Sequence, residues 1–164
     1  MERLPHFVLR LGMVLMLLVG PLRAQQDALF GLDARFSQIV RIDLESGAEQ
    51  ARYPSPVLCK PEGACGMAYN GHAVYIVDST DPDRRIYEVG AESGAIWHSM
   101  PSPPGSIDGL AYDDGVLYAL DFLTDTIYAL DPFDGSVLRE LSPGVDIIGG
   151  MGVSQGRLYA SRIR

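Results

Sequence analysis

The sequence predicts an all-β protein: a β-propeller of four-stranded antiparallel blades, with about three blades present in an incomplete ring. The first observation lies in residues 107–143, where short apolar runs alternate with tight turns as in one propeller blade. Asp114-Gly115 is a strong hairpin signal there, because both residues tolerate positive φ. The second observation is a repeat of 41 to 43 residues, close to the roughly 40–50 residues of a blade.

The repeat extends over strands that we label A to D within each blade. In strand A, residues 66–69 match residues 109–112 at an offset of 43. In strand C, residues 86–87 match residues 127–128 at an offset of 41. Residues 29–33 correspond to a strand B. The alternative is an ordinary antiparallel sandwich with regularly spaced turns.

Residues 1–24 are predicted to be a secretory signal peptide. Arg3 and Arg10 lie in the basic region that precedes an apolar stretch at 11–20, and Ala24 is a small residue at the expected cleavage point. The stretch is about half of the ~20 residues that a membrane-spanning helix needs. We therefore expect an extracytoplasmic protein, periplasmic or secreted, with an uncleaved anchor as the alternative.

The remaining domain, residues 25–164, is acidic. Cleavage would remove three Arg and one Glu, so 13 basic and 21 acidic residues become 10 and 20, and the net charge moves from −8 to −10. Such a charge argues against nucleic acid and anionic membranes as partners. We expect a protein or small-molecule ligand.

The domain divides into blades at about 28–53, 65–101, 107–142 and a truncated 148–164. This gives strands B, C and D of one blade, two full blades, and strands A and B of another, which is fewer than a closed ring needs. We expect an N-terminal fragment of a longer product. The alternative is an incomplete ring that closes by self-association, since open blades leave unpaired edges.

Two cysteines precede the second blade. Cys59 and Cys65 lie six residues apart, and two cysteines in an exported chain favour a disulfide over free thiols. So short a loop predicts local stiffening rather than large stabilisation.

The other polar residues are predicted to be structural. Residues 78–83 are rich in oxygen side chains, as calcium sites are, but lack the pattern of an EF-hand loop and indicate a solvated acidic loop. His72 and His98 are expected to be structural or surface residues. The recurring tyrosines are expected to pack within and between blades: Tyr69, Tyr75, Tyr87, Tyr112, Tyr118, Tyr128 and Tyr159.

The C–D turns carry a resemblance to known repeats. Residues 43–47, 91–97 and 130–138 share a turn, a glycine and a following aliphatic residue, and they resemble the repeats of YncE-like and quinoprotein-like propellers. In quinoprotein dehydrogenases a tryptophan docks between blades. Trp97 fits that position, whereas we place Gln50 and Arg139 at the equivalent positions, so quinone binding does not follow.

A second resemblance concerns the start of strand A. Residues 107–112, IDGLAY, resemble a segment of the SMP-30/gluconolactonase and strictosidine-synthase-like propellers. In the metal-dependent lactonases the aspartate of that segment binds a divalent ion, a role that falls here on Asp108. The cofactor implied is a divalent cation such as Ca²⁺. Ile107 replaces the family's proline, and the equivalent positions are Cys65 and Gly149.

These observations favour a non-enzymatic binding scaffold over an enzyme. The scaffold would bind a protein, peptide or small ligand at one face of the ring. The alternative is a divalent-metal-dependent hydrolase or lactonase with Asp108 as a ligand. A third and weaker hypothesis is a quinone-linked oxidoreductase.

Overall fold

The computed structural model describes residues 28–59, 65–79, 81–144 and 150–161, which form thirteen strands in four antiparallel sheets. Blade 1 contains β1 (Ala28–Asp33), β2 (Gln38–Asp43) and β3 (Glu49–Pro54). Blade 2 contains β4 (Cys65–Tyr69), β5 (Ala73–Asp78), β6 (Arg85–Gly90) and β7 (Ile96–Pro101).

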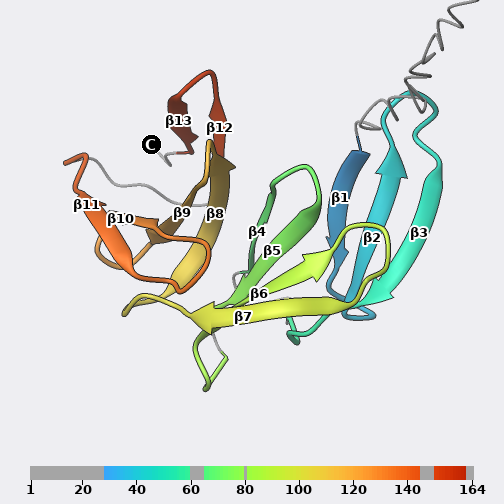
Figure 1. The fold of residues 1–164 in the computed structure, drawn as a ribbon, viewed down its shortest axis with the longest axis horizontal. Coiled ribbons are helices and arrows are strands. Elements are labelled where there is room, and N and C mark those ends of the chain that lie inside the picture. The colour runs from blue at the N-terminus through green and yellow to red at the C-terminus, as the bar shows by residue number, and fades with distance from the viewer. Residues whose placement is uncertain (1–27, 60–64, 80, 145–149, 162–164) are drawn as a thin grey trace, which may run out of the picture.

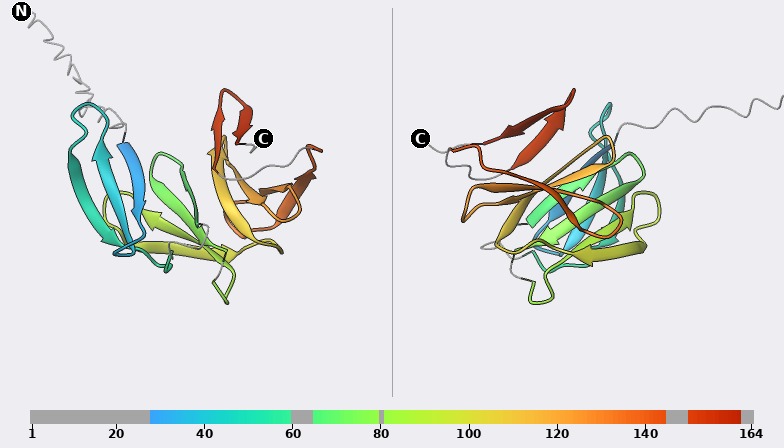
Figure 2. Two further views of the ribbon diagram at one scale, coloured as in Figure 1. Left: turned by 180° about the vertical axis from the view of Figure 1, so that it is seen from behind. Right: turned by 60° about the vertical axis from the view of Figure 1, so that its left-hand side comes forward.

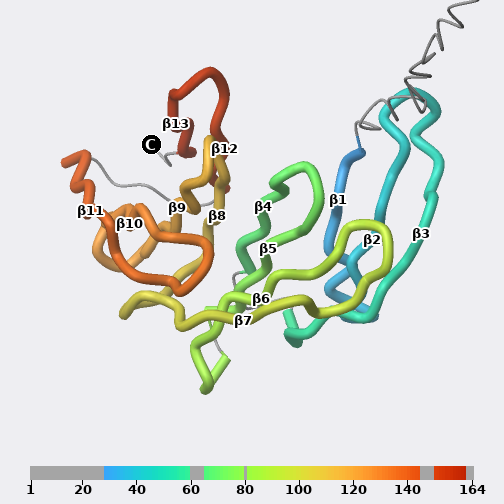
Figure 3. Tube along the Cα trace, in the orientation of Figure 1, coloured from blue at the N-terminus to red at the C-terminus, as the bar shows by residue number. Residues whose placement is uncertain are grey.

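Blade 3 contains β8 (Ile107–Asp113), β9 (Val116–Asp121), β10 (Thr126–Leu130) and β11 (Val137–Leu141), and blade 4 contains β12 (Met151–Ser154) and β13 (Arg157–Ala160). The blades follow one another along an open arc (Figures 1 and 2). The inner strands β1, β4, β8 and β12 face the concave side and the last strand of each full blade lies outside (Figure 3). The predicted all-β fold of four-stranded antiparallel units is confirmed, and the described strands do not close a ring.

The proposed signal segment and Gly149 lie outside the described residues. None of the described segments forms a helix with the length and hydropathy that crossing a bilayer requires.

The C–D turn has one geometry in all three blades. Gly47, Gly94 and Gly135 have φ of 69°, 66° and 76°, and each donates its N–H to the carbonyl four residues earlier. Beside each turn the pairing register between strands C and D shifts, at Arg41/Ile42, Glu88/Val89 and Ala129/Leu130 of strand C. Glycine is favoured because side chains disfavour positive φ.

The predicted hairpin in blade 3 is also confirmed. Asp114 and Gly115, between β8 and β9, have φ of 43° and 81°. Two successive positive φ values characterise the tight turn whose twist matches that of antiparallel strands.

The core lies between blades. Phe30 of blade 1 packs on Tyr69 of blade 2, with ring centroids 4.8 Å apart, and Tyr75 of blade 2 stacks on Tyr112 of blade 3 at 5.8 Å. These pairs join equivalent strands, so a strand-B aromatic ring of one blade meets a strand-A ring of the next. The predicted packing role of these tyrosines is confirmed, but Tyr159 differs: its side chain is exposed because only β12 pairs with β13 among the described strands.

The outer strand of one blade packs on the C–D turn of the next. A Cβ at Gly94 would overlap the Tyr53 ring, and one at Gly135 would lie 2.6 Å from the Pro101 carbonyl oxygen. Tyr53 also donates its hydroxyl to the Glu92 carbonyl at 3.1 Å. The packing of an outer strand on the following turn therefore joins blade 1 to blade 2 and blade 2 to blade 3.

The position of Trp97 corrects two expectations. Its ring lies over Gly90 of its own blade, where a Cβ would collide with it, and the side chain is 56% exposed instead of buried between blades. The register pairs Val89 with Ile96 and Leu130 with Val137, so the third residue after the turn glycine in blade 3 is Leu138. The assignment of Arg139 to that position was wrong by one residue.

Candidate functional site

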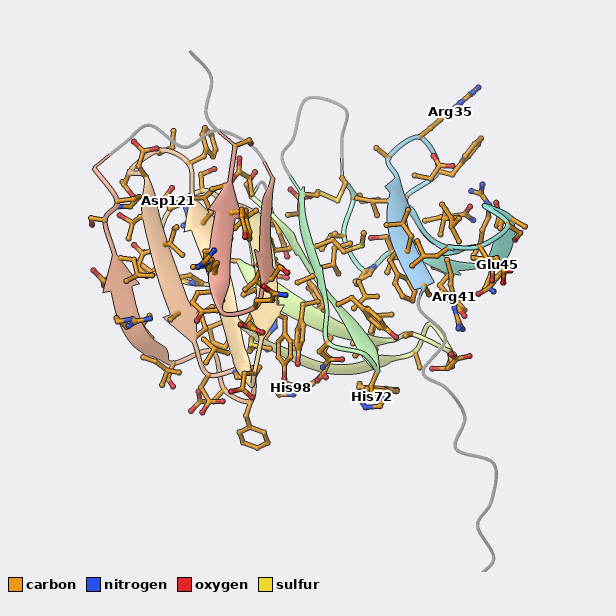
Figure 4. All side chains as sticks on the ribbon, turned by 90° about the horizontal axis from the view of Figure 1, so that it is seen from above. Arg35, Arg41, Glu45, His72, His98 and Asp121 are labelled. Carbon is orange, nitrogen blue, oxygen red and sulfur yellow. A yellow bond between two sulfur atoms is a disulfide. The ribbon has the colours of Figure 1, made fainter. Side chains whose placement is uncertain are left out.

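The strands of the blades run between two sides of the arc, and the turns and links lie on one side or the other. Arg35, in the B–C link of blade 1, and Asp121, at the end of β9, lie on one side of the molecule, while His72 and His98 lie on the opposite side (Figure 4). The first side carries the links between blades and the start of each strand A. Asp108 begins β8, so it belongs to that side.

A bulge presents Asp108. Ile107 pairs with Asp121 and Gly109 pairs with Leu120, so Asp108 is the extra residue between two paired positions. An extra residue in one strand redirects its side chain out of the regular alternation. The backbone therefore places the Asp108 carboxyl close to Asp121; we call Asp108 and Asp121 the acidic corner.

One of the two oxygens of the Asp108 carboxyl lacks a partner in the described part of the chain. Its Oδ1 atom is buried and has no hydrogen-bond partner among the described residues. Burial raises the pKa of Asp108 to about 6, and the negative charge of Asp121 adds to that rise. A buried acceptor without a partner is costly, so this oxygen favours a donor or a cation from outside the chain.

The other member of the acidic corner is fully engaged. Asp121 is buried, and its Oδ1 accepts the N–H groups of Ser106 at 3.0 Å and Leu123 at 3.1 Å. Its Oδ2 accepts the Thr124 hydroxyl at 2.8 Å. Asp121 therefore holds the B–C link and the preceding interblade link in place.

The link that precedes Asp108 is fixed from two blades. Gly105 has φ of 110°, and a Cβ at this position would overlap the Asp121 carboxylate. Arg84, in the B–C link of blade 2, donates to the Gly105 carbonyl at 3.0 Å. The sequence did not predict these contacts of Gly105 with Arg84 and Asp121. The recurring aspartate at the end of strand B, at Asp33, Asp78 and Asp121, was a signal for the turn.

The equivalent corner of blade 2 contains the disulfide. Cys59 and Cys65 are bonded, with their Cα atoms 5.9 Å apart, and Cys65 pairs with Asp78 in the sheet. The two sulfur atoms and a carboxylate oxygen of Asp78 lie within 4.8 Å of one another. Metals bind thiolates, and the disulfide leaves neither sulfur in that form.

Among the described residues, Asp108 belongs to no group of three side chains that could hold a metal ion together. The only described group of three possible ligand residues is Cys59, Cys65 and Asp78. No three carboxylates of the 78–83 loop are brought together within the described part of the chain. The metal role of Asp108 thus stays a prediction.

Both histidines that sequence analysis considered lie far from this face. His98 contacts the Phe133 carbonyl oxygen through Nε2 at 2.7 Å, and the two rings stack at 6.0 Å. The His72 carbonyl accepts the Ala91 N–H at 3.0 Å. His98 thus joins blade 2 to blade 3, and neither histidine contributes to the acidic corner.

No protein-family model matches the chain, and no curated protein matches its sequence. Its structure is similar to the crystal structure of Myxococcus xanthus glutaminyl cyclase, with a TM-score of 0.65 and 15% identity over 82% of this chain and 63% of that chain. It is also similar to the structure of U3-55K, with a TM-score of 0.56 and 17% identity over 76% of this chain and 38% of that one.

A further similarity is to the computationally designed Ika4 protein, with a TM-score of 0.55 and 13% identity over 84% of this chain and 86% of that chain. Identities this low show the propeller-like fold alone. They do not assign the chain to the YncE-like or SMP-30-like families that its repeats resemble. The chain spans less than two thirds of the glutaminyl cyclase and U3-55K chains.

Proposed function

We propose that this protein is an extracytoplasmic binding scaffold that takes a cationic group of its ligand at the acidic corner. One observation carries the proposal: the buried Oδ1 of Asp108 has no partner among the described residues. A cation or an ammonium group would satisfy that oxygen and favour the ionised carboxylate. The acidic chain, with a formal charge of −8, would attract such a ligand.

The rigidity of the corner supports a binding role. Asp121 and the Arg84–Gly105 contact fix the link beside Asp108, so the carboxyl is held before a ligand arrives. A site that is formed in advance loses less conformational entropy on binding. The signal-like sequence of residues 1–24 supports an extracytoplasmic location. Determining the N-terminal residue of the purified exported chain would test whether this segment is cleaved.

The test is ligand-dependent thermal stability. Calcium chloride and, separately, lysine amide are titrated into the wild type, Asp108→Asn and Asp114→Asn. Asp114 is exposed, and Asn also tolerates its positive φ, so it is a matched control. Either ligand at about 100 times its Kd should stabilise the wild type and the control by about 2.7 kcal/mol, and the Asp108→Asn variant much less. Equal responses of all three chains would refute the proposal.

The alternative is a divalent-metal-dependent hydrolase or lactonase. The same unpartnered oxygen favours it, because a carboxylate at the start of strand A could help hold a cation that activates water. It requires further ligands beyond the described ones. Calcium-dependent turnover of a simple lactone, lost with chelator and in Asp108→Asn, would favour the enzyme. Binding without turnover would favour the scaffold.

A further inference from the structure

Blade 2 carries a counterpart of the acidic corner. Cys65 begins β4 and pairs with Asp78 at the end of β5, in the repeat positions that Asp108 and Asp121 occupy in blade 3. Cys59, in the link before β4, is bonded to Cys65. We call Cys59, Cys65 and Asp78 the sulfur corner. It has two sulfur atoms where the corner of blade 3 has the carboxylate of Asp108.

The three ligand atoms of the sulfur corner lie close enough together for one metal ion. The two sulfur atoms and a carboxylate oxygen of Asp78 are all within 4.8 Å of one another. Zinc bonds are about 2.3 Å to sulfur and about 2.0–2.2 Å to a carboxylate oxygen, so the ligand atoms of one tetrahedral ion lie roughly 3.5–3.8 Å apart. The Cα atoms of the two cysteines are 5.9 Å apart. Small side-chain rotations would therefore place all three atoms around one ion once the S–S bond is open.

The residues of the sulfur corner are also held by contacts other than the disulfide. Cys59 is 2% exposed and packs in the cluster between blades 1 and 2 that contains Val57. Cys65 is held in the sheet by its pairing with Asp78, and Asp78 is 5% exposed. These contacts remain when the S–S bond is absent. The three side chains therefore stay near one another in the dithiol form, and a site formed in advance loses less conformational entropy on binding.

The donor atoms of the sulfur corner favour zinc over calcium. Thiolates are soft ligands that select zinc, and a carboxylate oxygen is a common further zinc ligand. Calcium takes about six to eight oxygen atoms, whereas this group of side chains supplies one carboxylate. Two thiolates beside a buried carboxylate would bring three negative charges together. A divalent cation compensates such a group of buried charges.

We propose that the dithiol form of this protein binds one Zn²⁺ ion through Cys59, Cys65 and Asp78. Every copy of the chain is synthesised with both cysteines as thiols, so the dithiol form precedes the disulfide. On binding, Zn²⁺ replaces the two thiol protons, which pass to the solvent. The described residues fill three positions of a tetrahedral ion, and water fills the fourth. The site uses no residue of the acidic corner, so it is independent of the ligand proposed at Asp108.

Zinc binding and disulfide formation exclude each other at this corner. A small-molecule disulfide oxidises the two thiolates: it takes up their two electrons and two protons from solvent, leaves as two thiols, and the protein S–S bond forms as Zn²⁺ is released. A dithiol reverses the step by giving two electrons and two protons to the protein disulfide and closing its own S–S bond. The ion joins the link before β4 to both β4 and β5, because Asp78 ends β5. One crosslink of the interblade link therefore replaces another.

The first experiment uses cobalt(II) chloride as a probe, because bonds from cobalt to thiolate sulfur give a charge-transfer absorption that bonds to oxygen do not give. The purified chain is reduced with a phosphine, desalted without oxygen, and titrated with cobalt(II) and then with zinc chloride. The reduced wild type should bind one cobalt ion and show the sulfur absorption. Zinc should remove that absorption, because zinc binds such sites more tightly than cobalt does. The disulfide form should not show it.

Three variants, studied in the reduced state, assign the ligands. Cys65→Ser should lose the one-to-one binding of cobalt, because a single thiolate remains. Asp78→Asn keeps both thiolates and should raise the dissociation constant for zinc about tenfold or more. Asp83→Asn removes the same charge at an exposed position in the link after β5, so it is the matched control and should bind zinc as the wild type does. Circular dichroism without metal checks that each variant is folded.

Thermal unfolding gives a second readout that does not depend on cobalt. Zinc chloride should raise the Tm of the reduced wild type and of Asp83→Asn, and it should not raise the Tm of Cys65→Ser. If Asp78→Asn does not fold, the comparison of Cys65→Ser with the wild type still tests the site. A reduced wild type without the sulfur absorption, the same absorption in the disulfide form, or equal zinc affinities of folded Asp78→Asn and the control would overturn the proposal.

Discussion

At the scale of single residues, the neighbouring blade decides what a turn tolerates. Gly47 and Gly94 occupy the same turn position with nearly the same φ. Nothing lies within 4 Å of a Cβ at Gly47, whereas one at Gly94 would enter the Tyr53 ring. The two glycines therefore separate the cost of positive φ from the cost of a close approach.

Replacing these glycines by alanine should give unequal losses of stability. Gly47→Ala should cost about 1 kcal/mol, the penalty of a left-handed conformation with a Cβ. Gly94→Ala adds an overlap with Tyr53 and should cost about 3 kcal/mol. Urea denaturation followed by circular dichroism measures both. Equal losses would show that Tyr53 moves aside freely.

We expect the stability of the fold to depend on pH through Asp108. Its pKa is raised from 3.8 to about 6, so the folded state holds the proton more tightly than the unfolded chain. This favours the folded state below pH 3.8, and the advantage is lost as the pH rises through about 6. Asp108→Asn should therefore stabilise the fold above pH 7. We expect about 1 kcal/mol, less than the full shift implies because the carboxyl is half exposed.

Urea denaturation of the wild type and Asp108→Asn, in chelator at pH 7.5 and pH 4, checks this expectation. The gain should be near zero at pH 4. Asp114→Asn controls for the general loss of one negative charge. The same gain at both pH values would contradict a raised pKa.

Part of the candidate site could be selected from the sequence. The resemblance of residues 107–112 to a known segment singled out Asp108. Its unpartnered oxygen could not be predicted, because that depends on the bulge between Ile107 and Gly109 and on the packing around it. The saturation of Asp121 by Ser106, Leu123 and Thr124 also needs the three-dimensional path of the link.

At the scale of strands and turns, the turn residues of the sequence were sufficient to predict which segments form strands and which form turns. Asp114-Gly115 predicted a hairpin, and the turn glycines predicted the C–D turns. The residue of blade 3 that is equivalent to Trp97 was harder to predict, because the sequence of strand D does not determine its register. The backbone bonds from Gly90 to Ala95 and from Asp131 to Ser136 make the two turns equally long, which selects Leu138.

The disulfide acts at this scale because it ties an interblade link to a strand. Cys59 is buried beside Val57 in the cluster between blades 1 and 2, and Cys65 begins β4. Replacing both cysteines by alanine should lower stability by about 2 kcal/mol, as expected for closing a loop of this size. Thermal unfolding with and without a dithiol reductant should show a lower Tm for the reduced wild type and no effect on the variant. An unchanged wild-type Tm would mean that packing alone holds the link.

At the scale of the whole molecule, the repeat predicted an arc but not the way its blades are joined. Arg41 of blade 1 forms a 2.7 Å ion pair with Glu92 of blade 2, and the guanidinium is buried while Glu92 is exposed. At the next joint the contacts are His98 with Phe133 and Arg84 with Gly105. These contacts differ between joints, so a repeat that averages over blades cannot show them.

The packing of an outer strand on the next blade's turn has a direction along the chain. Tyr53 precedes the Gly94 turn that it covers, and Pro101 precedes the Gly135 turn. During synthesis the covering strand therefore emerges before the turn that it receives. Each new blade can fold against a surface that is already in place, and the arc is suited to assembly from its N-terminal end while the chain is still being made.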